Sequence, residues 1–260
     1  MKVLASLAAV GVTTAVAVAV VGLPVSFTPT AVAVEAAPST TTTTTAATAP
    51  PLAVGPVVTP PLPAELALGA EGADVLRLQA RLIELRYDPG AVDGRYGAET
   101  ALAVMAFQKI GGLKRTGVAN SETMLALAGA ADPAPLVPTG APSRVEVDMA
   151  RQVLFVWSDG QLVKILPVST GNGKRYCENG ACGVAVTPLG EFRAERRIAG
   201  AHRSPLGVLY NPVYFHRGFA IHGSPSIPPY PASHGCVRVP IHSSRWVYDH
   251  VANGTPVHLI

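Results

Sequence analysis

The spacing of hydrophobic positions divides this chain into three patterned regions. An uncharged run rich in Ala, Val and Leu occupies positions 3–23. Val75, Leu78 and Leu82 then recur at intervals of four residues or fewer, which is the spacing of one helix face. After about residue 143, apolar residues alternate with polar ones, as they do in half-buried strands. The pattern predicts an apolar N-terminal segment, a helical region and a mainly β region, in that order.

The N-terminal run has the features of an export signal. Lys2 precedes it, Pro24 follows it, and Ala31-Val32-Ala33 gives the small-x-small pattern of a signal-peptidase site. We therefore expect residues 1–33 to be a signal peptide and the rest of the chain to be secreted. The run is also long enough to span a bilayer, so an uncleaved membrane anchor is the alternative.

Two Pro-rich segments divide the rest of the chain. Residues 34–64 contain six consecutive threonines and repeated prolines, a composition that predicts an extended tether without a core. Residues 131–143 (ADPAPLVPTGAPS) form a second Pro-rich linker. The predicted domains are therefore 65–130 and 144–260.

The first of these domains is predicted to be a small bundle of three helices. Turn signals at Asp88–Gly90 and Asp93-Gly94 follow the first helix. The second helix is expected over about 98–110, where Gly111-Gly112 ends it, and a short third helix follows Ser121. The residues show no acid–base pair and no metal-ligand spacing, so a structural spacer is one interpretation of this domain.

A loop in this bundle supports a different interpretation. The sequence Asp93–Thr100 (DGRYGAET), flanked by LQARL and AFQ, resembles the peptidoglycan-binding family of three-helix modules. The order of helix, loop and helix matches along the whole module. The resemblance implies that this domain binds peptidoglycan, with its groove near Asp93–Tyr96.

The second domain is predicted to be mainly β. Val153, Phe155 and Trp157 alternate with their neighbours, and the turn signal Ser158-Asp159-Gly160 leads into a further apolar segment. Only residues 243–251 have a helical pattern. The predicted fold class is thus α+β multidomain, with a three-helix bundle followed by a mainly β, sandwich or barrel-like domain.

The three cysteines are of two kinds. Cys177 and Cys182 enclose four residues, and in an exported protein such a pair is expected to form a local disulfide. Cys236 is left over, in the sequence SHGCVR, with His222 upstream in IHG. A cysteine nucleophile needs an imidazole that takes its proton, and backbone amides beside a glycine can hold an oxyanion. The residues around Cys236 meet both needs.

These motifs match the L,D-transpeptidase (YkuD-type) catalytic family, and Thr187–Phe192 resembles its TPxGxF segment. The resemblance covers about residues 143–260. It implies that Cys236 attacks a peptidoglycan stem peptide, releases D-Ala and forms a thioester, which the amine of a second stem resolves into a 3→3 crosslink. His222 is then the general base and later the general acid, and neither a cofactor nor a metal is needed. A carbapenem is expected to add covalently to Cys236.

The same resemblance assigns supporting roles to neighbouring residues. The amides of Gly235 and Cys236 are expected to hold the oxyanion. Some relatives carry a serine where this chain has Gly223, so here a backbone carbonyl would have to orient His222. The predicted oxyanion and pocket residues are Ser233, His234, Gly235, Gly223 and Arg238. Two weaker candidates for substrate contact, equally suited to packing, are Tyr214 and Tyr230.

Other functions remain open at this stage. Water in place of the acceptor amine would make the protein an L,D-carboxypeptidase, and a degenerate β domain would leave a non-catalytic peptidoglycan-binding protein. His222, His234 and Cys236 could instead ligate zinc, although no fourth ligand is evident. A net charge of only +3 without a Lys/Arg cluster argues against a nucleic-acid partner. The expected partners are peptidoglycan stem peptides and glycan, with membrane contact only through an uncleaved N-terminal segment, and no oligomeric state is predicted.

Overall fold

The computed structural model describes residues 65–178 and 180–260, which belong to one compact unit, Val58–Ile260. The predicted signal peptide or anchor over 1–33 and the tether over 34–64 lie outside the described residues. Among the helices of the described part of the chain, none has the length and apolar character needed to cross a membrane.

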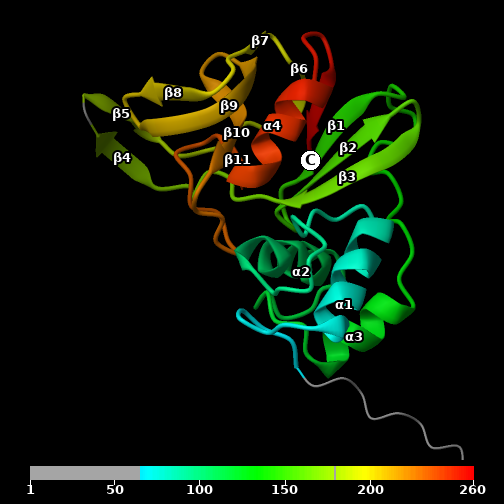
Figure 1. The fold of residues 1–260 in the computed structure, drawn as a ribbon. Coiled ribbons are helices and arrows are strands. Elements are labelled where there is room, and N and C mark those ends of the chain that lie inside the picture. Colours follow the sequence, from blue (N-terminus) through cyan, green and yellow to red (C-terminus); the bar gives the residue numbers. More distant parts are fainter. Residues whose placement is uncertain (1–64, 179) are drawn as a thin grey trace, which may run out of the picture. The chain divides into compact units, whose positions relative to one another are not determined.

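Helices come first along the described chain and strands follow (Figure 1). The helices are α1 (Ala73–Glu84), α2 (Ala98–Ile110), α3 (Ser121–Ala128) and α4 (Ile241–His250). The strands are β1 (Arg144–Asp148), β2 (Val153–Ser158), β3 (Gln161–Pro167), β4 (Arg175–Glu178), β5 (Ala181–Val184), β6 (Gly190–Arg193), β7 (Arg196–Arg197), β8 (Ala201–Ser204), β9 (Gly207–His216), β10 (Phe219–Ser224), β11 (Val237–Pro240) and β12 (Pro256–Leu259). The predicted order, a helical region before a mainly β domain, is confirmed.

The helical region is organised around α2. Helix α1 buries Val75, Leu78 and Leu82, the apolar positions that its spacing predicted. Helix α2 packs against α1 and also against strands β2 and β3. It is therefore buried over most of its second half, from Ala103 to Lys109. A helix with partners on two sides has no solvent face, which explains its continuous burial.

Two sheets form the β domain. One has the strand order β3-β2-β1-β12-β6, and the other has β11-β10-β9-β7 with β8 also paired to β9. Val147 and Leu154 of the first sheet share a core with Val213 and Ile221 of the second and with Val247 of α4. Alternating residues of two facing sheets close such a core, so the predicted sandwich-like architecture is confirmed.

The helical and β regions also share a hydrophobic core. Tyr87 and Phe107 of the helical region are buried together with Phe155 and Ile165 of strands β2 and β3. The Tyr87 and Phe107 rings pack edge to face, with 5.8 Å between their centres. The Pro-rich segment 131–143 thus connects two regions that are packed against each other.

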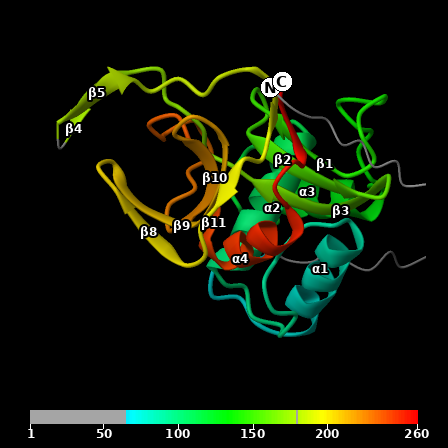
Figure 2. The ribbon, with the colours of Figure 1, turned by 90° about the horizontal axis from the view of Figure 1, so that it is seen from above.

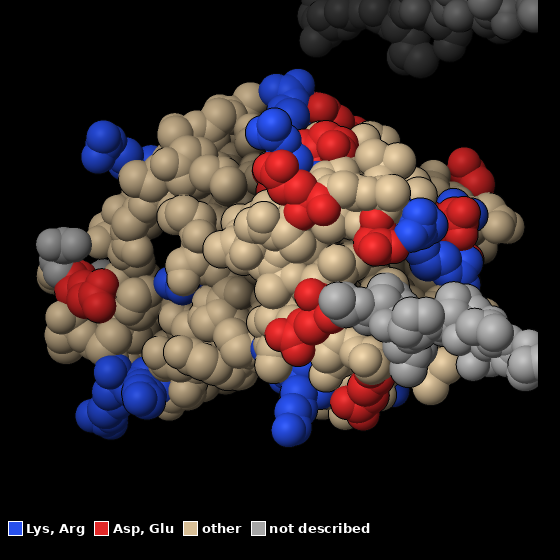
Figure 3. Space-filling model, turned by 60° about the horizontal axis from the view of Figure 1, so that its bottom comes forward, with Lys and Arg blue, Asp and Glu red and all other residues tan. Residues whose placement is uncertain are grey.

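Charged side chains are mixed on the face drawn in Figure 3. Lys and Arg side chains alternate there with Asp and Glu side chains, and neither sign gathers into a broad patch. The helical region also holds exposed ion pairs such as Arg95–Glu71, with 3.8 Å between Nε and Oε1. Exposed pairs of this kind add little stability.

Candidate active site

The strand register brings His222 and Cys236 to the same place. Strands β10 and β11 are parallel, and His222 is paired with Arg238. Cys236 directly precedes β11, so it lies beside Ala220, two residues before His222. Residues two apart on a strand point to the same face. His222, Cys236 and Arg238 accordingly line one cavity of about 450 Å³.

His222 is held in one tautomer by its own strand. Its Nδ1 lies 2.8 Å from the carbonyl oxygen of Gly223. A carbonyl can only accept, so Nδ1 carries the proton and Nε2 keeps its lone pair. Burial, opposed by the Gly223 hydrogen bond and assisted by the nearby charge of Arg238, lowers the pKa of His222 to about 4. The imidazole is therefore neutral at physiological pH and its Nε2 is a free base.

Gly223 leaves no room for a side chain at this point of β10. A Cβ atom there would lie 2.6 Å from both Cβ and Oγ of Ser244 on α4, and 3.1 Å from Cβ of Tyr210. Atoms that close must move. The packing of α4 explains why the carbonyl of Gly223, instead of a serine side chain, orients His222.

The Cys236 thiol is half-buried and unpaired. Burial raises its pKa, while a hydrogen bond from the Ala220 amide and the charge of Arg238 oppose that rise. Its Sγ lies 3.8 Å from the carbonyl oxygen of Gly218. A thiol with a raised pKa beside an imidazole with a lowered pKa rests as a neutral pair, not as an ion pair. Proton transfer must then accompany attack by the sulfur.

Residues 233–236, which we call the catalytic turn, are fixed by Ser233. The Ser233 hydroxyl accepts a hydrogen bond from the Gly235 amide at 3.0 Å and donates one to the Cys236 carbonyl at 2.6 Å. Gly235 has φ +132°, and a Cβ there would lie 2.6 Å from the Phe219 ring. Only glycine fits this position. The bond to Ser233 also occupies the Gly235 amide, one of the two amides predicted to hold the oxyanion.

The TPxGxF-like segment supports the catalytic turn from outside. The Thr187 hydroxyl donates to the Gly235 carbonyl at 2.6 Å and accepts from the Gly171 amide at 2.8 Å. A Cβ on Gly171 would lie 2.2 Å from the Ala185 carbonyl oxygen. The sequence resemblance marked Thr187 without giving it a role, and its contacts supply one.

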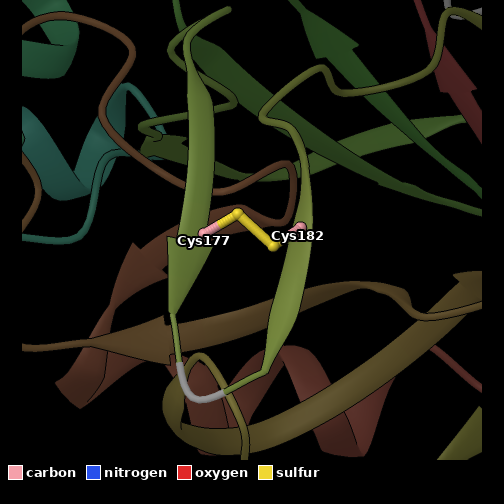
Figure 4. Close-up of a disulfide and its surroundings, with 2 residues drawn as sticks. All are labelled: Cys177 and Cys182. Carbon is pink, nitrogen blue, oxygen red and sulfur yellow. A yellow bond between two sulfur atoms is a disulfide. The ribbon is translucent and has the colours of Figure 1, made fainter.

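The predicted disulfide is present in the β4–β5 hairpin. Cys177 and Cys182 face each other across the two strands, with their Cα atoms 4.1 Å apart (Figure 4). The hairpin stands at one edge of the β domain in both ribbon views (Figures 1 and 2). Tyr176 and Val184 of this hairpin line the cavity.

His234 connects the catalytic turn to that hairpin. Its Nε2 lies 3.2 Å from Oε1 of Glu178, and its ring meets the Tyr176 ring edge to face at 4.8 Å. Sequence reasoning identified neither Glu178 nor Tyr176 as a site residue. Their hairpin has no family motif, and its position beside His234 follows from tertiary packing alone.

The charged side chains that line the cavity are arginines. Arg196 and Arg238 line it, and no Asp or Glu does so in the part of the chain that the structure describes. The Arg196 guanidinium lies 4.2 Å from the centre of the Tyr214 ring, a cation–π geometry. Tyr214 is thus a buried packing aromatic that also lines the cavity, where it could contact substrate. Tyr230 is 61% exposed and does not line this cavity.

The zinc alternative finds no support in the geometry. Within residues 65–178 and 180–260, no group of three His, Cys, Asp or Glu side chains is arranged to hold a metal ion. His234 instead faces Glu178.

Comparisons with known proteins identify the family of this chain. Residues 142–259 match the family model of the L,D-transpeptidase catalytic domain (YkuD), and residues 71–127 match that of the peptidoglycan binding domain. The crystal structure of an L,D-transpeptidase from Xylanimonas cellulosilytica is 42% identical, with a TM-score of 0.72. That alignment covers 78% of this chain and 100% of the other. The chain therefore belongs to the L,D-transpeptidase family.

Two further matches are partial or distant. The N-acetylmuramoyl-L-alanine amidase CwlM of Mycobacterium tuberculosis is 43% identical over 56 residues, which is 22% of this chain and 14% of that protein. An L,D-transpeptidase structure from Stackebrandtia nassauensis is 24% identical, with a TM-score of 0.42, over 75% of this chain and 94% of the other. The two matched families together identify peptidoglycan as the material on which this chain acts.

Proposed function

We propose that this protein is a cell-wall L,D-transpeptidase that forms 3→3 peptidoglycan crosslinks through a thioester at Cys236. The observation that carries this proposal is the pairing of Cys236 with a neutral, oriented His222 in one cavity. A neutral imidazole and a protonated thiol that line one cavity are the two groups that general-base activation of a nucleophile requires.

The acylation step follows from these two residues. Nε2 of His222 removes the thiol proton as Sγ of Cys236 attacks the carbonyl carbon of the third stem residue. The tetrahedral intermediate collapses, its C–N bond breaks, and the departing D-Ala amine takes the proton from His222. The product is a thioester, which keeps the acyl group activated without an external energy source.

The second half-reaction uses the same groups in reverse. The side-chain amine of a second stem attacks the thioester carbonyl and gives a proton to His222. The C–S bond breaks, and the Cys236 sulfur recovers its proton from His222. We assign oxyanion stabilisation to the Cys236 amide and to the positive charge of Arg238, because the Gly235 amide already donates to Ser233.

The lining of the cavity supports a donor that carries a carboxylate. Arg196 presents its guanidinium there on the face of Tyr214, and no hydrogen bond or ion pair to a carboxylate engages it within the described residues. A guanidinium binds a carboxylate in a bidentate manner. We assign Arg196 to a free carboxylate of the donor stem.

The remaining parts of the proposal concern location. Signal-peptide cleavage after residue 33 would release the protein into the wall, and the 34–64 tether would give it reach. The matched peptidoglycan binding module over residues 71–127 would hold it there, with a groove beside Asp93, Gly94 and Arg95 as the candidate contact.

One experiment tests the enzymatic proposal. The purified protein and its Cys236→Ala variant are incubated with disaccharide-tetrapeptide, and the products are read by mass spectrometry. We expect a crosslinked dimer with loss of one D-Ala, formed only by the protein that carries Cys236. Tripeptide alone would make the enzyme a carboxypeptidase, and product formation by the alanine variant would refute the assignment of the nucleophile.

A further inference from the structure

Lys109 of helix α2 is buried in an unusual way. Its side chain is 1% exposed, and no carboxylate in the described chain pairs with it. Its Nζ donates to the carbonyls of Gln152 at 3.0 Å and Val168 at 2.9 Å. Both acceptors belong to the β domain, whereas Lys109 belongs to the helical module. Burying an amine is costly unless its donors are satisfied, so this lysine acts as a bond between the two regions.

The bond is compatible with either charge state of Lys109. Burial, assisted by the charge of Arg115, lowers the pKa of its amine to about 7. A neutral amine still has two N–H groups, one for each carbonyl. The contact to Gln152 and Val168 therefore persists on both sides of neutrality.

The acceptors of Lys109 lead directly toward the catalytic turn. The Gln152 side chain donates from Nε2 to the Thr170 hydroxyl at 2.8 Å and accepts from the Thr170 amide at 2.9 Å. The Thr170 carbonyl then accepts from the Ser233 amide at 2.8 Å. Ser233 in turn donates to the Cys236 carbonyl. Each of these hydrogen bonds is 3.0 Å or shorter, and together they connect α2 to the nucleophile.

A second residue of the module reaches the same region. Arg115 donates from Nη1 to the Pro229 carbonyl at 3.1 Å, in the Pro-rich loop between the two site strands. By contrast, the Ser243 hydroxyl donates to Asp88 at 2.9 Å, which joins the module to α4 and involves no residue of the catalytic turn. The interface thus contains bonds that lead to the turn, such as those of Lys109, and bonds that lie beside it, such as Ser243–Asp88.

We propose that Lys109 is a positioning residue for Cys236, and that the helical module is a structural part of the active site as well as a binding module. In this role Lys109 fixes the end of β3, and the Gln152–Thr170–Ser233 series transmits that position to the catalytic turn. The turnover arm of the test rests on the proposed transpeptidase function, whereas the exchange and alkylation arms do not.

The test compares Lys109→Met with Ser243→Ala in the intact protein. Lys109→Met removes both donors at nearly constant length, and Ser243→Ala removes the parallel interface bond. Backbone amide exchange over residues 230–238, the rate of Cys236 alkylation by iodoacetamide, and kcat and KM for disaccharide-tetrapeptide are measured for each.

For Lys109→Met we expect about tenfold faster exchange in the turn and about tenfold lower kcat, with KM changed less than twofold, because misplacing a nucleophile affects the transition state. Ser243→Ala should leave the exchange of the turn and kcat near wild type. If Lys109→Met does not fold, Lys109→Gln, which retains two N–H donors on a shorter side chain, is expected to give a smaller change in the same direction.

An unchanged turn in the lysine variants, or an equal change in Ser243→Ala, would overturn the proposal. Altered exchange and alkylation in Lys109→Met without any crosslinking by the wild-type protein would leave the positioning role standing and refute the transpeptidase assignment instead.

Discussion

The catalytic turn and the β4–β5 hairpin both border the same cavity, but their backbones are held differently. The turn is anchored by Ser233, Thr187 and the strand β11 that follows it. The two strands of the hairpin form a separate sheet among the described residues, and they carry their own disulfide. The proposed nucleophile Cys236 lies on the first element, next to the strand β10 that carries His222, whereas Tyr176 and Val184 of the second element line the cavity wall. This division is what chemistry with positional tolerance of a fraction of an ångström demands.

The comparison is tested most severely at the two histidines that line the cavity. We expect His222→Gln to lower kcat by about a thousandfold, because it removes the general base, whereas His234→Gln should lower it less than tenfold. Steady-state turnover of disaccharide-tetrapeptide by both variants measures the difference. Equal losses in the two variants would mean that both histidines handle protons and that the hairpin, through its contacts with His234, takes part in the chemistry.

A smaller loss is expected from crowding at Gly223. Gly223→Ala places a Cβ against Ser244 and should displace His222, lowering kcat about tenfold and stability by about 1–3 kcal/mol. Ser244→Gly in the same chain removes the clash at its source and should restore much of both. Thermal melts and turnover of the single and double variants form the measurement. If Ser244→Gly restored neither the kcat nor the stability of Gly223→Ala, the clash with Ser244 would not be the cause of the loss.

The contact proposed between Arg196 and a carboxylate of the donor stem should affect substrate binding more than turnover. We expect Arg196→Gln to raise KM about fivefold with kcat nearly unchanged, since an exposed charge–charge contact contributes only about 1 kcal/mol. The control is Arg193→Gln, whose guanidinium donates to the Gly254 carbonyl outside this cavity. A donor stem with an amidated carboxylate should bind the wild-type protein and Arg196→Gln alike. A rise in KM for Arg193→Gln but not for Arg196→Gln would contradict the assignment of Arg196 to the donor carboxylate.

The hairpin should give the smallest effect. The Cys177–Cys182 disulfide closes only a short loop. Reducing it, or replacing both cysteines by serine, should therefore lower the free energy of unfolding by about 1–2 kcal/mol at most. Turnover is expected to change less than threefold, through looser contacts of Glu178 and Tyr176 with His234. A collapse of the melting temperature on reduction would show that the hairpin supports the fold.

The features predicted from the sequence were those that residues close together in the chain encode. The 3–4 spacing of Val75, Leu78 and Leu82 defines one helix face, and a five-residue separation was enough to pair Cys177 with Cys182. His222 and Cys236 were found because their motifs are short and contiguous. The carbonyl that orients His222 was also anticipated, since glycine at position 223 has no side chain for that task.

Contacts between distant segments were beyond such patterns. Lys109 reads as an ordinary lysine near a helix end, and only the packing of α2 on β2 and β3 buries it. The shared core was hidden by the Pro-rich segment 131–143, which predicted separate domains. The hydrogen bond from Gly235 to Ser233 depends on a φ of +132°, which no spacing reveals.

The protonation state of the Cys236–His222 pair is the central claim, and the pH dependence of Cys236 alkylation by iodoacetamide tests it most directly. Burial raises the pKa of the thiol and lowers that of His222 to about 4. We therefore expect a rate that is low and flat through neutrality and rises only in the alkaline range, above the ordinary thiol pKa of about 8.5. Cys236→Ala provides the background. A rate that has already reached a plateau between pH 5 and 7 would mean a resting thiolate–imidazolium pair, and it would contradict the account.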